Sequence, residues 1–102
     1  MTEQPEKMTR EELKEFIFDD LVEFIVQTGS TNAITPEEIA EVVGETPSRV
    51  KGCMMQMEQD GVLEKFKQEG TLYFQLEEDT LAHIVEEMQA EGWEPPTEEE
   101  SQ

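Results

Sequence analysis

Two Thr-Pro pairs constrain the fold of this chain more than any other feature of its sequence. They are Thr35-Pro36 and Thr46-Pro47. A threonine hydroxyl can accept a hydrogen bond from the unpaired amides at a helix start. Proline is tolerated at the first helical position because the N–H at that position has no helical partner. Gly44 lies between the two pairs and suits a helix end and a turn. The pattern therefore predicts two short joined helices, Pro36 to Val43 and Pro47 to about Asp60.

The apolar residues of these two predicted helices fall at helical spacing, so each helix is expected to bury one face. In the first helix they are Ile39, Ala40 and Val43, and in the second they are Val50, Cys53, Met54 and Met57. Ala40 is small enough to let the two helices approach closely.

A longer helix precedes this pair. Thr9 and Glu12 have the spacing of a capping box, and Gly29 suits the helix end. The main apolar stripe runs through Leu13, Phe16, Ile17, Leu21, Phe24 and Ile25. A second stripe, Phe18, Val22 and Val26, makes the apolar surface wider than a helix facing a single core requires. We therefore expect this helix to be covered on two sides, either by the last helix of the same chain or by a second copy.

Two strand-like runs follow, at 62–67 and 71–76, and the residues between them predict a three-residue hairpin loop, Gln68-Glu69-Gly70. Alternation within the runs predicts one buried face. Its members are Phe66, Leu72, Phe74 and Leu76.

A final helix is predicted from apolar residues at helical spacing: Leu81, Ile84, Val85 and Met88. It is expected to end at Gly92, with Trp93 folding back onto it. The segments 1–8 and 94–102 are poor in apolar residues and rich in Glu and Pro, which predicts disordered tails around one domain at 9–93.

The predicted fold class is mainly α with a small β-hairpin, in the order helix, helix, helix, hairpin, helix. Over the stretch from Thr35 to Leu76 the sequence resembles the winged helix-turn-helix superfamily. The resemblance is carried by the apolar, small and turn positions of the helix pair, by the DGVL sequence at 60–63 and by Phe74-Gln75-Leu76. It departs from the pattern at Glu45, where an apolar residue often follows the turn glycine. The resemblance implies that the third helix and the hairpin, called the wing, face duplex DNA.

The charge of the chain is distributed unevenly. The whole sequence has a net charge of −19, a field that repels nucleic acid and favours basic proteins as partners. Residues 1–45 have a net charge of −9 and residues 77–102 of −10, whereas 46–76 hold four acidic and four basic residues. The predicted third helix and wing are thus a neutral segment in an acidic chain.

The candidate DNA-binding residues lie in this neutral segment. We assign phosphate contacts to Lys51, Lys65 and Lys67, and base contacts to Arg49 with Gln56 or Gln59. Ser48 completes the set. Gly52 and Met55 share the outward stripe of the same helix, and they suit a protein partner as well as DNA.

Two functions remain open from the sequence. The first is a transcriptional regulator that binds duplex DNA, as a homodimer formed through the first and last helices. The alternative is an acidic adaptor, inhibitor or DNA mimic that binds a basic protein and not DNA. The partner-binding candidates are Met55, Phe18, Val22 and Val26.

The sequence contains no recognisable catalytic, metal-binding or cofactor-binding constellation. The single Cys53 excludes an internal disulfide and is expected to be a small core residue. His83 is isolated and is expected to be a surface residue. No apolar run approaches the ~20 residues of a membrane span, so we expect a cytoplasmic protein that is not an enzyme.

Overall fold

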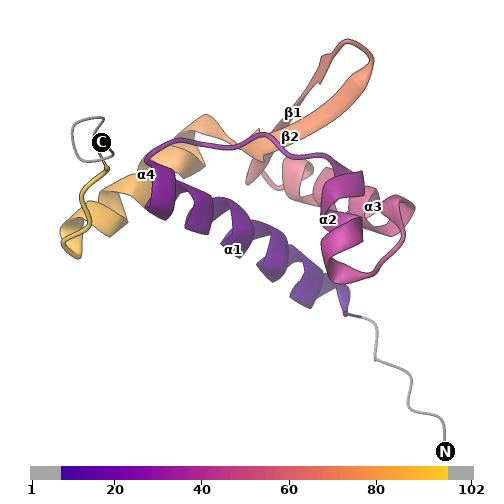
Figure 1. Cartoon of the computed structure of the whole chain (residues 1–102), viewed down its shortest axis with the longest axis horizontal. Helices are drawn as coiled ribbons and strands as arrows, with labels where there is room; N and C mark the ends of the chain where they lie inside the picture. The colour runs from indigo at the N-terminus through magenta and orange to yellow at the C-terminus, as the bar shows by residue number, and fades with distance from the viewer. Residues whose placement is uncertain (1–7, 97–102) are drawn as a thin grey trace, which may run out of the picture.

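The structure is a computed structural model that describes residues 8–96 and contains four helices and one hairpin (Figure 1). The predicted order of elements is confirmed, and it is the arrangement of a winged helix-turn-helix. The elements are α1 (Arg10–Thr28), α2 (Pro36–Val43), α3 (Pro47–Gln59), β1 (Leu63–Gln68), β2 (Thr71–Leu76) and α4 (Glu78–Ala90). Most of the two tails predicted to be disordered, at 1–7 and 97–102, lies outside the described residues.

The helices begin at the caps that the sequence predicts. Thr9 and Thr35 each form a complete capping box, and the Thr46 hydroxyl accepts from the amide of Arg49 at 3.3 Å. α1 and α2 end at Gly29 and Gly44, whose φ angles of 77° and 76° are left-handed. Local chemistry thus sets the bounds of the first three helices.

The core lies between α1, α3 and the base of the hairpin. Leu13, Ile17 and Leu21 form the buried face of α1, and all three are fully inaccessible. From α3 come the four residues predicted to be buried, Val50, Cys53, Met54 and Met57. The hairpin contributes Leu63, Phe74 and Leu76.

A two-residue contact ties the hairpin to the segment before α2. The amide of Ile34 donates to the carbonyl of Phe74 at 2.8 Å, and the amide of Phe74 donates to the carbonyl of Ile34 at 2.8 Å. Both side chains are buried. This bridge was not predicted, because the sequence indicated only a turn between α1 and α2.

The predicted hairpin loop is wrong by one residue. Gln68 pairs with Thr71, so only Glu69 and Gly70 connect the strands. Both residues have positive φ, 51° and 84°, as a type I′ turn requires. A two-residue turn of this type suits the hairpin because its backbone twist matches the right-handed twist of the paired strands.

The predicted face of Phe66 is also wrong. The register pairs Phe66 with Tyr73, and it pairs Lys65 with Phe74. Paired residues share a face, so Phe66 lies on the outer side of the hairpin, where it is 37% exposed and stacks on Tyr73 with ring centroids 5.5 Å apart. The predicted positions of Phe74 and Leu76 in the core are confirmed, and Leu72 is half-buried.

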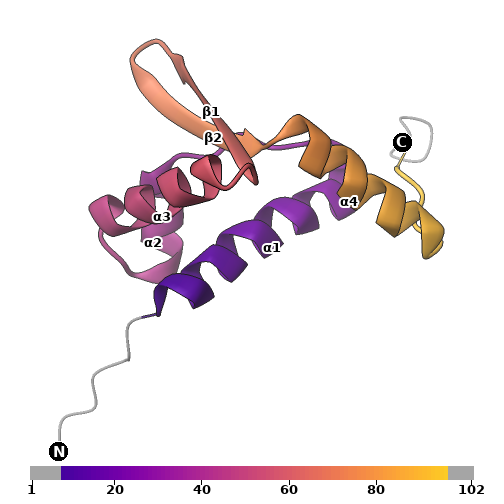
Figure 2. The same cartoon turned by 180° about the vertical axis from the view of Figure 1, so that it is seen from behind.

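α4 packs loosely against the end of α1 (Figure 2). Its N-cap is Glu77, whose carboxylate accepts from the amide of Thr80 at 3.0 Å, and this hydrogen bond lowers the pKa of Glu77. The predicted fold-back of Trp93 is confirmed, since its amide donates to the carbonyl of Met88 at 2.9 Å. The Trp93 indole N–H donates to the carbonyl of Val26 at 3.1 Å and so joins α4 to α1.

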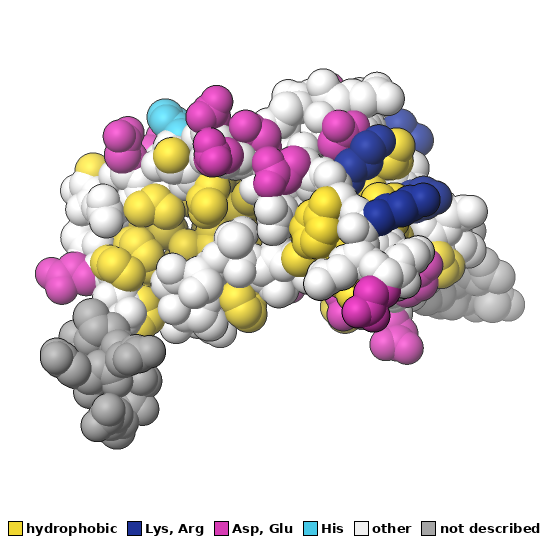
Figure 3. Space-filling model, turned by 90° about the horizontal axis from the view of Figure 1, so that it is seen from above, with side chains coloured by type: hydrophobic (Ala, Val, Ile, Leu, Met, Phe, Trp, Pro, Cys, Tyr) yellow, Lys and Arg dark blue, Asp and Glu magenta, His cyan; other side chains and the backbone are white. Residues whose placement is uncertain are grey.

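The second apolar stripe of α1 is only partly covered within the described residues. Phe18 and Val22 are half-buried, and Val26 is 40% exposed. Figure 3 shows hydrophobic side chains gathered beside α4, whose His83 marks its place in the view. The apolar surface along α1 and α4 is therefore wider than the chain itself covers.

The cap of α2 provides a stability test of the fold. Thr35→Ala removes the acceptor of the Glu38 amide, at 3.2 Å in a part-buried site, so we expect the free energy of unfolding to fall by about 1 kcal/mol. Urea denaturation measures the change. Thr31→Ala, at an exposed position in the preceding segment, is the matched control and should change it little. Equal losses in the two variants would contradict a role for this cap.

Candidate nucleic-acid interface

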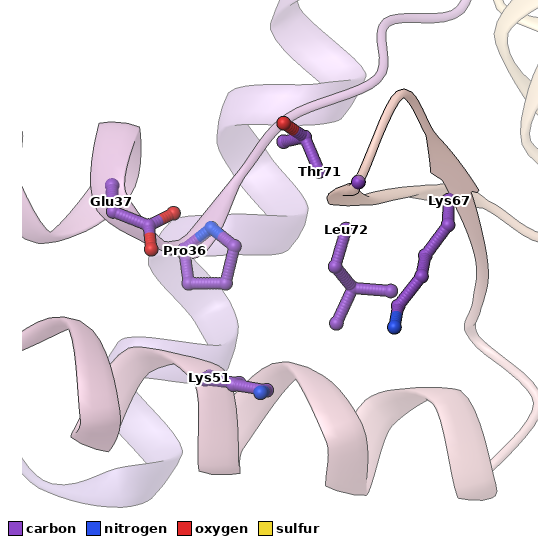
Figure 4. A pocket seen from close by; sticks show the side chains of 7 residues that line it. Pro36, Glu37, Lys51, Lys67, Thr71 and Leu72 are labelled. Carbon is purple, nitrogen blue, oxygen red and sulfur yellow. The ribbon is translucent and has the colours of Figure 1, made fainter.

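A cleft of about 440 Å³ lies between the start of α2, α3 and the end of the wing (Figure 4). We call it the wing cleft. Its lining residues are Pro36, Glu37, Lys51, Lys67, Gly70, Thr71 and Leu72. The side chains of Lys51 and Lys67 extend into the space beside Leu72, whereas Glu37 lies on the far side of Pro36. Two cations, one from α3 and one from β1, thus share one concave surface.

The hairpin register explains how Lys67 reaches this cleft. Lys67 pairs with Leu72, and Lys65 pairs with Phe74, so both lysines lie on the face of the hairpin that also carries its core residues. That face is turned toward α3. Lys51 and Lys67 were predicted from the sequence as contact residues, but the cleft walls at Pro36, Thr71 and Leu72 were not. The Ile34–Phe74 bridge, which the sequence did not reveal, is what brings these walls together.

The exposed side of α3 carries the outer stripe, which we define as Ser48, Gly52, Met55 and Gln59. By helical periodicity these residues lie opposite the buried face of α3. Ser48, Gly52 and Gln59 are exposed, whereas Met55 is half-buried, with its sulfur 3.9 Å from the ammonium of Lys65. The stripe is uncharged, with polar side chains at Ser48 and Gln59, and it adjoins the wing cleft through Lys51.

Arg49 is held away from the outer stripe. Its guanidinium donates to the Glu45 carboxylate at 2.7 Å and to the backbone carbonyl of Met8. The Glu45 side chain is only 3% exposed. Glu45, the departure from the superfamily pattern, therefore closes the helix turn with an ion pair in place of an apolar contact. Arg49 thus ties α3 to the beginning of α1, and its contact with bases stays a prediction.

Two further predicted contact residues have partners within the chain. The ammonium of Lys65 lies 3.7 Å from the Glu58 carboxylate, which links the wing to α3. The side-chain amide of Gln56 donates to Asp60 at 3.2 Å, on the side of α3 away from the wing. By contrast, within residues 8–96 no ion pair involves Lys51 or Lys67.

The charges of the described surface separate by region. In Figure 3, the visible Lys and Arg side chains lie toward the wing, and Asp and Glu side chains border the hydrophobic area near α4. On the face shown in Figure 3, an approaching anion therefore meets repulsion over α4 and attraction toward the wing.

The other titratable groups offer no catalytic arrangement in the part of the chain that the structure describes. Burial raises the pKa of the Cys53 thiol, as expected for a core cysteine, although Lys14 acts in the opposite direction. Partial burial, together with Glu23 and Glu38, raises the pKa of Asp20. Residues 8–96 contain no group of His, Cys, Asp and Glu arranged to hold a metal ion. None of the described helices is long and apolar enough to cross a membrane.

Comparisons with known proteins give two similar solved structures. One is TubR bound to 24 bp of tubC, from Bacillus thuringiensis serovar israelensis pBtoxis, with 15% identity and a TM-score of 0.48. That match covers 86% of this chain and 100% of the other. The second is a type III plasmid segregation TubR, with 15% identity, a TM-score of 0.46 and coverage of 92% and 98%. At these TM-scores neither likeness supports a conclusion about ligand or partner. No family model and no curated protein matches the chain.

Gly52 allows the outer stripe to be tested for close contact. A Cβ atom at this position would meet nothing within 4 Å, so Gly52→Ala is expected to stabilise α3, by about 1 kcal/mol. Thermal or urea denaturation measures this gain. If a ligand backbone lies directly against the stripe, the same variant binds more weakly although it is more stable. A variant that is destabilised would contradict the open position of Gly52.

Proposed function

We propose that this chain is a winged-helix DNA-binding protein that regulates transcription. The observation that carries the proposal is the wing cleft, where Lys51 and Lys67 extend into one space beside the uncharged outer stripe of α3. In a winged helix, the corresponding helix enters the major groove and the wing contacts the neighbouring backbone. The observed separation of charge favours this face over every other described surface for a polyanion.

The proposed DNA contacts are of two kinds, to backbone phosphates and to base edges. The ammonium groups of Lys51 and Lys67 and the hydroxyl of Thr71 contact backbone phosphates. The start of α2 adds the positive end of its helix dipole to the same cleft. Ser48 and Gln59 on the outer stripe read base edges. Lys65 and Gln56 stay in the contact set only if DNA displaces the carboxylates of Glu58 and Asp60 that they face.

Few cations per protomer imply that the protein binds DNA as a dimer. Two phosphate contacts support only weak binding against a net charge of −19. The apolar surface formed by Val22 and Val26 of α1 with α4 is the proposed dimer interface, because it is left partly exposed. The dimer would double the phosphate contacts without any further basic residue.

The proposal predicts a specific response to salt and to charge reversal. We expect a duplex selected from a random library to bind with a slope of log K against log salt of about −2 per protomer and about −4 for a dimer. Lys51→Glu and Lys67→Glu should each lower affinity for this duplex by about tenfold or more, and fluorescence anisotropy measures the loss. The matched control is Arg10→Glu, the same charge change at an exposed residue of α1 outside the wing cleft.

The control should retain most of the affinity, after allowance for its effect on net charge. If no duplex is enriched, or if the lysine variants bind like the wild type, the proposed interface is wrong. Equal losses in all three variants would show a general charge effect and would also contradict the proposal.

A further inference from the structure

A second concave surface lies on the opposite side of α3 from the outer stripe. It is a groove of about 250 Å³ between the first half of α1, the end of α3 and the start of the hairpin. We call it the α1–α3 groove. Its apolar residues are Phe18, Met57 and Val62, of which Met57 is buried and the other two are half-buried. Its charged residues are Glu11, Lys14, Glu15, Asp19 and Asp60.

The rim of this groove is strongly acidic. Four carboxylates and one ammonium surround the apolar residues, a net charge of −3. Lys14 lies 4.0 Å from Glu11 and 3.9 Å from Asp60, so its charge is shared between these two. Glu15 and Asp19 are exposed, and no ion pair within residues 8–96 involves either of them. The groove thus combines apolar surface with uncompensated negative charge.

We propose that the α1–α3 groove binds a basic amphipathic segment of a partner protein. One apolar side chain of the segment enters between Phe18, Met57 and Val62. Lys or Arg residues on either side of it pair with Glu15 and Asp19. Charge complementarity selects this occupant, because the acidic rim repels the phosphate backbone of DNA and attracts Lys and Arg side chains.

The size of the groove limits the kind of contact. A volume of about 250 Å³ is smaller than most small-molecule pockets, and it suits one large side chain anchored from a longer segment. A helix that presents an apolar anchor between basic residues is a common form of such a ligand. The long acidic face of α1 then provides the remaining contacts.

The groove and the wing cleft can be occupied together. Met57 and Asp60 lie on sides of α3 turned away from Ser48 and Gln59, by the helical period. Binding of a protein segment in the α1–α3 groove is therefore a function separate from DNA binding and does not depend on it. A protein with both surfaces would hold DNA on one side of α3 and a basic protein segment on the other.

A defined peptide tests the proposal. The probe is a fluorescein-labelled peptide of about 15 residues containing Leu, Lys and Arg, with Leu at helical spacing. A second peptide has the same composition in an order that breaks the spacing. We expect the full chain to bind the first peptide about tenfold more tightly than the second, measured by anisotropy. Equal affinity would show that composition alone drives binding and would overturn the proposal.

Matched charge reversals locate the site. Glu15→Lys combined with Asp19→Lys should lower affinity for the amphipathic peptide by about tenfold. Glu41→Lys combined with Glu86→Lys makes the same change in net charge at exposed residues of α2 and α4, and should lower it far less. Similar losses in both double variants would overturn the proposal.

The apolar anchor is tested with Phe18→Ala, whose folding is checked by circular dichroism. We expect about a tenfold loss of peptide affinity and unchanged affinity for DNA. The surface-charge variants keep the test valid if Phe18→Ala does not fold. A basic peptide bound in the wing cleft would bind more tightly to Lys51→Glu, so a marked gain of peptide affinity in that variant would overturn the proposal, whatever the outcome for DNA.

Discussion

The backbone bridge between Ile34 and Phe74 is the contact on which the candidate interface depends. Its two hydrogen bonds hold the hairpin against the segment that leads into α2. Phe74 is fully buried in the core, so the bridge also anchors the wing to the helices. Pro36 begins α2 two residues after Ile34, which places the start of α2 beside the wing. Without this bridge, the walls of the wing cleft would have no fixed relation to one another.

The surfaces on the two sides of α3 differ in charge, so they suit different kinds of ligand. The body of the protein is acidic, and two of the four basic residues of α3 and the wing are balanced by Glu45 and Glu58. Lys51 and Lys67 remain available at the wing cleft, where a polyanion can approach. On the other side of the helix, Glu15 and Asp19 border apolar residues, where a polycation can approach. α3 thus lies between one surface that suits a polyanion and another that suits a polycation.

The sequence predicted the features that depend on local chemistry. The Thr caps, the glycine ends and the buried face of α3 all follow from residues a few positions apart. The features it missed depend on contacts between distant residues. The attachment of the Arg49 guanidinium to Glu45 and Met8 cannot be read from spacing. The face of Phe66 and the length of the turn followed from the strand register, which one residue of loop length determines. For the same reason, Lys67 could be identified from the sequence, but the wing cleft that it lines could not.

The central claim is that the wing cleft and the outer stripe form the nucleic-acid surface. Amide NMR of the labelled full chain, titrated with a selected DNA duplex, tests it most directly. We predict that shift changes are concentrated at Ser48, Lys51 and Gly52 and in the wing from Lys67 to Thr71, while the amides of Glu15 and Asp19 remain unchanged. Changes confined to α1 and α4, or no changes with the duplex in excess, would contradict the account.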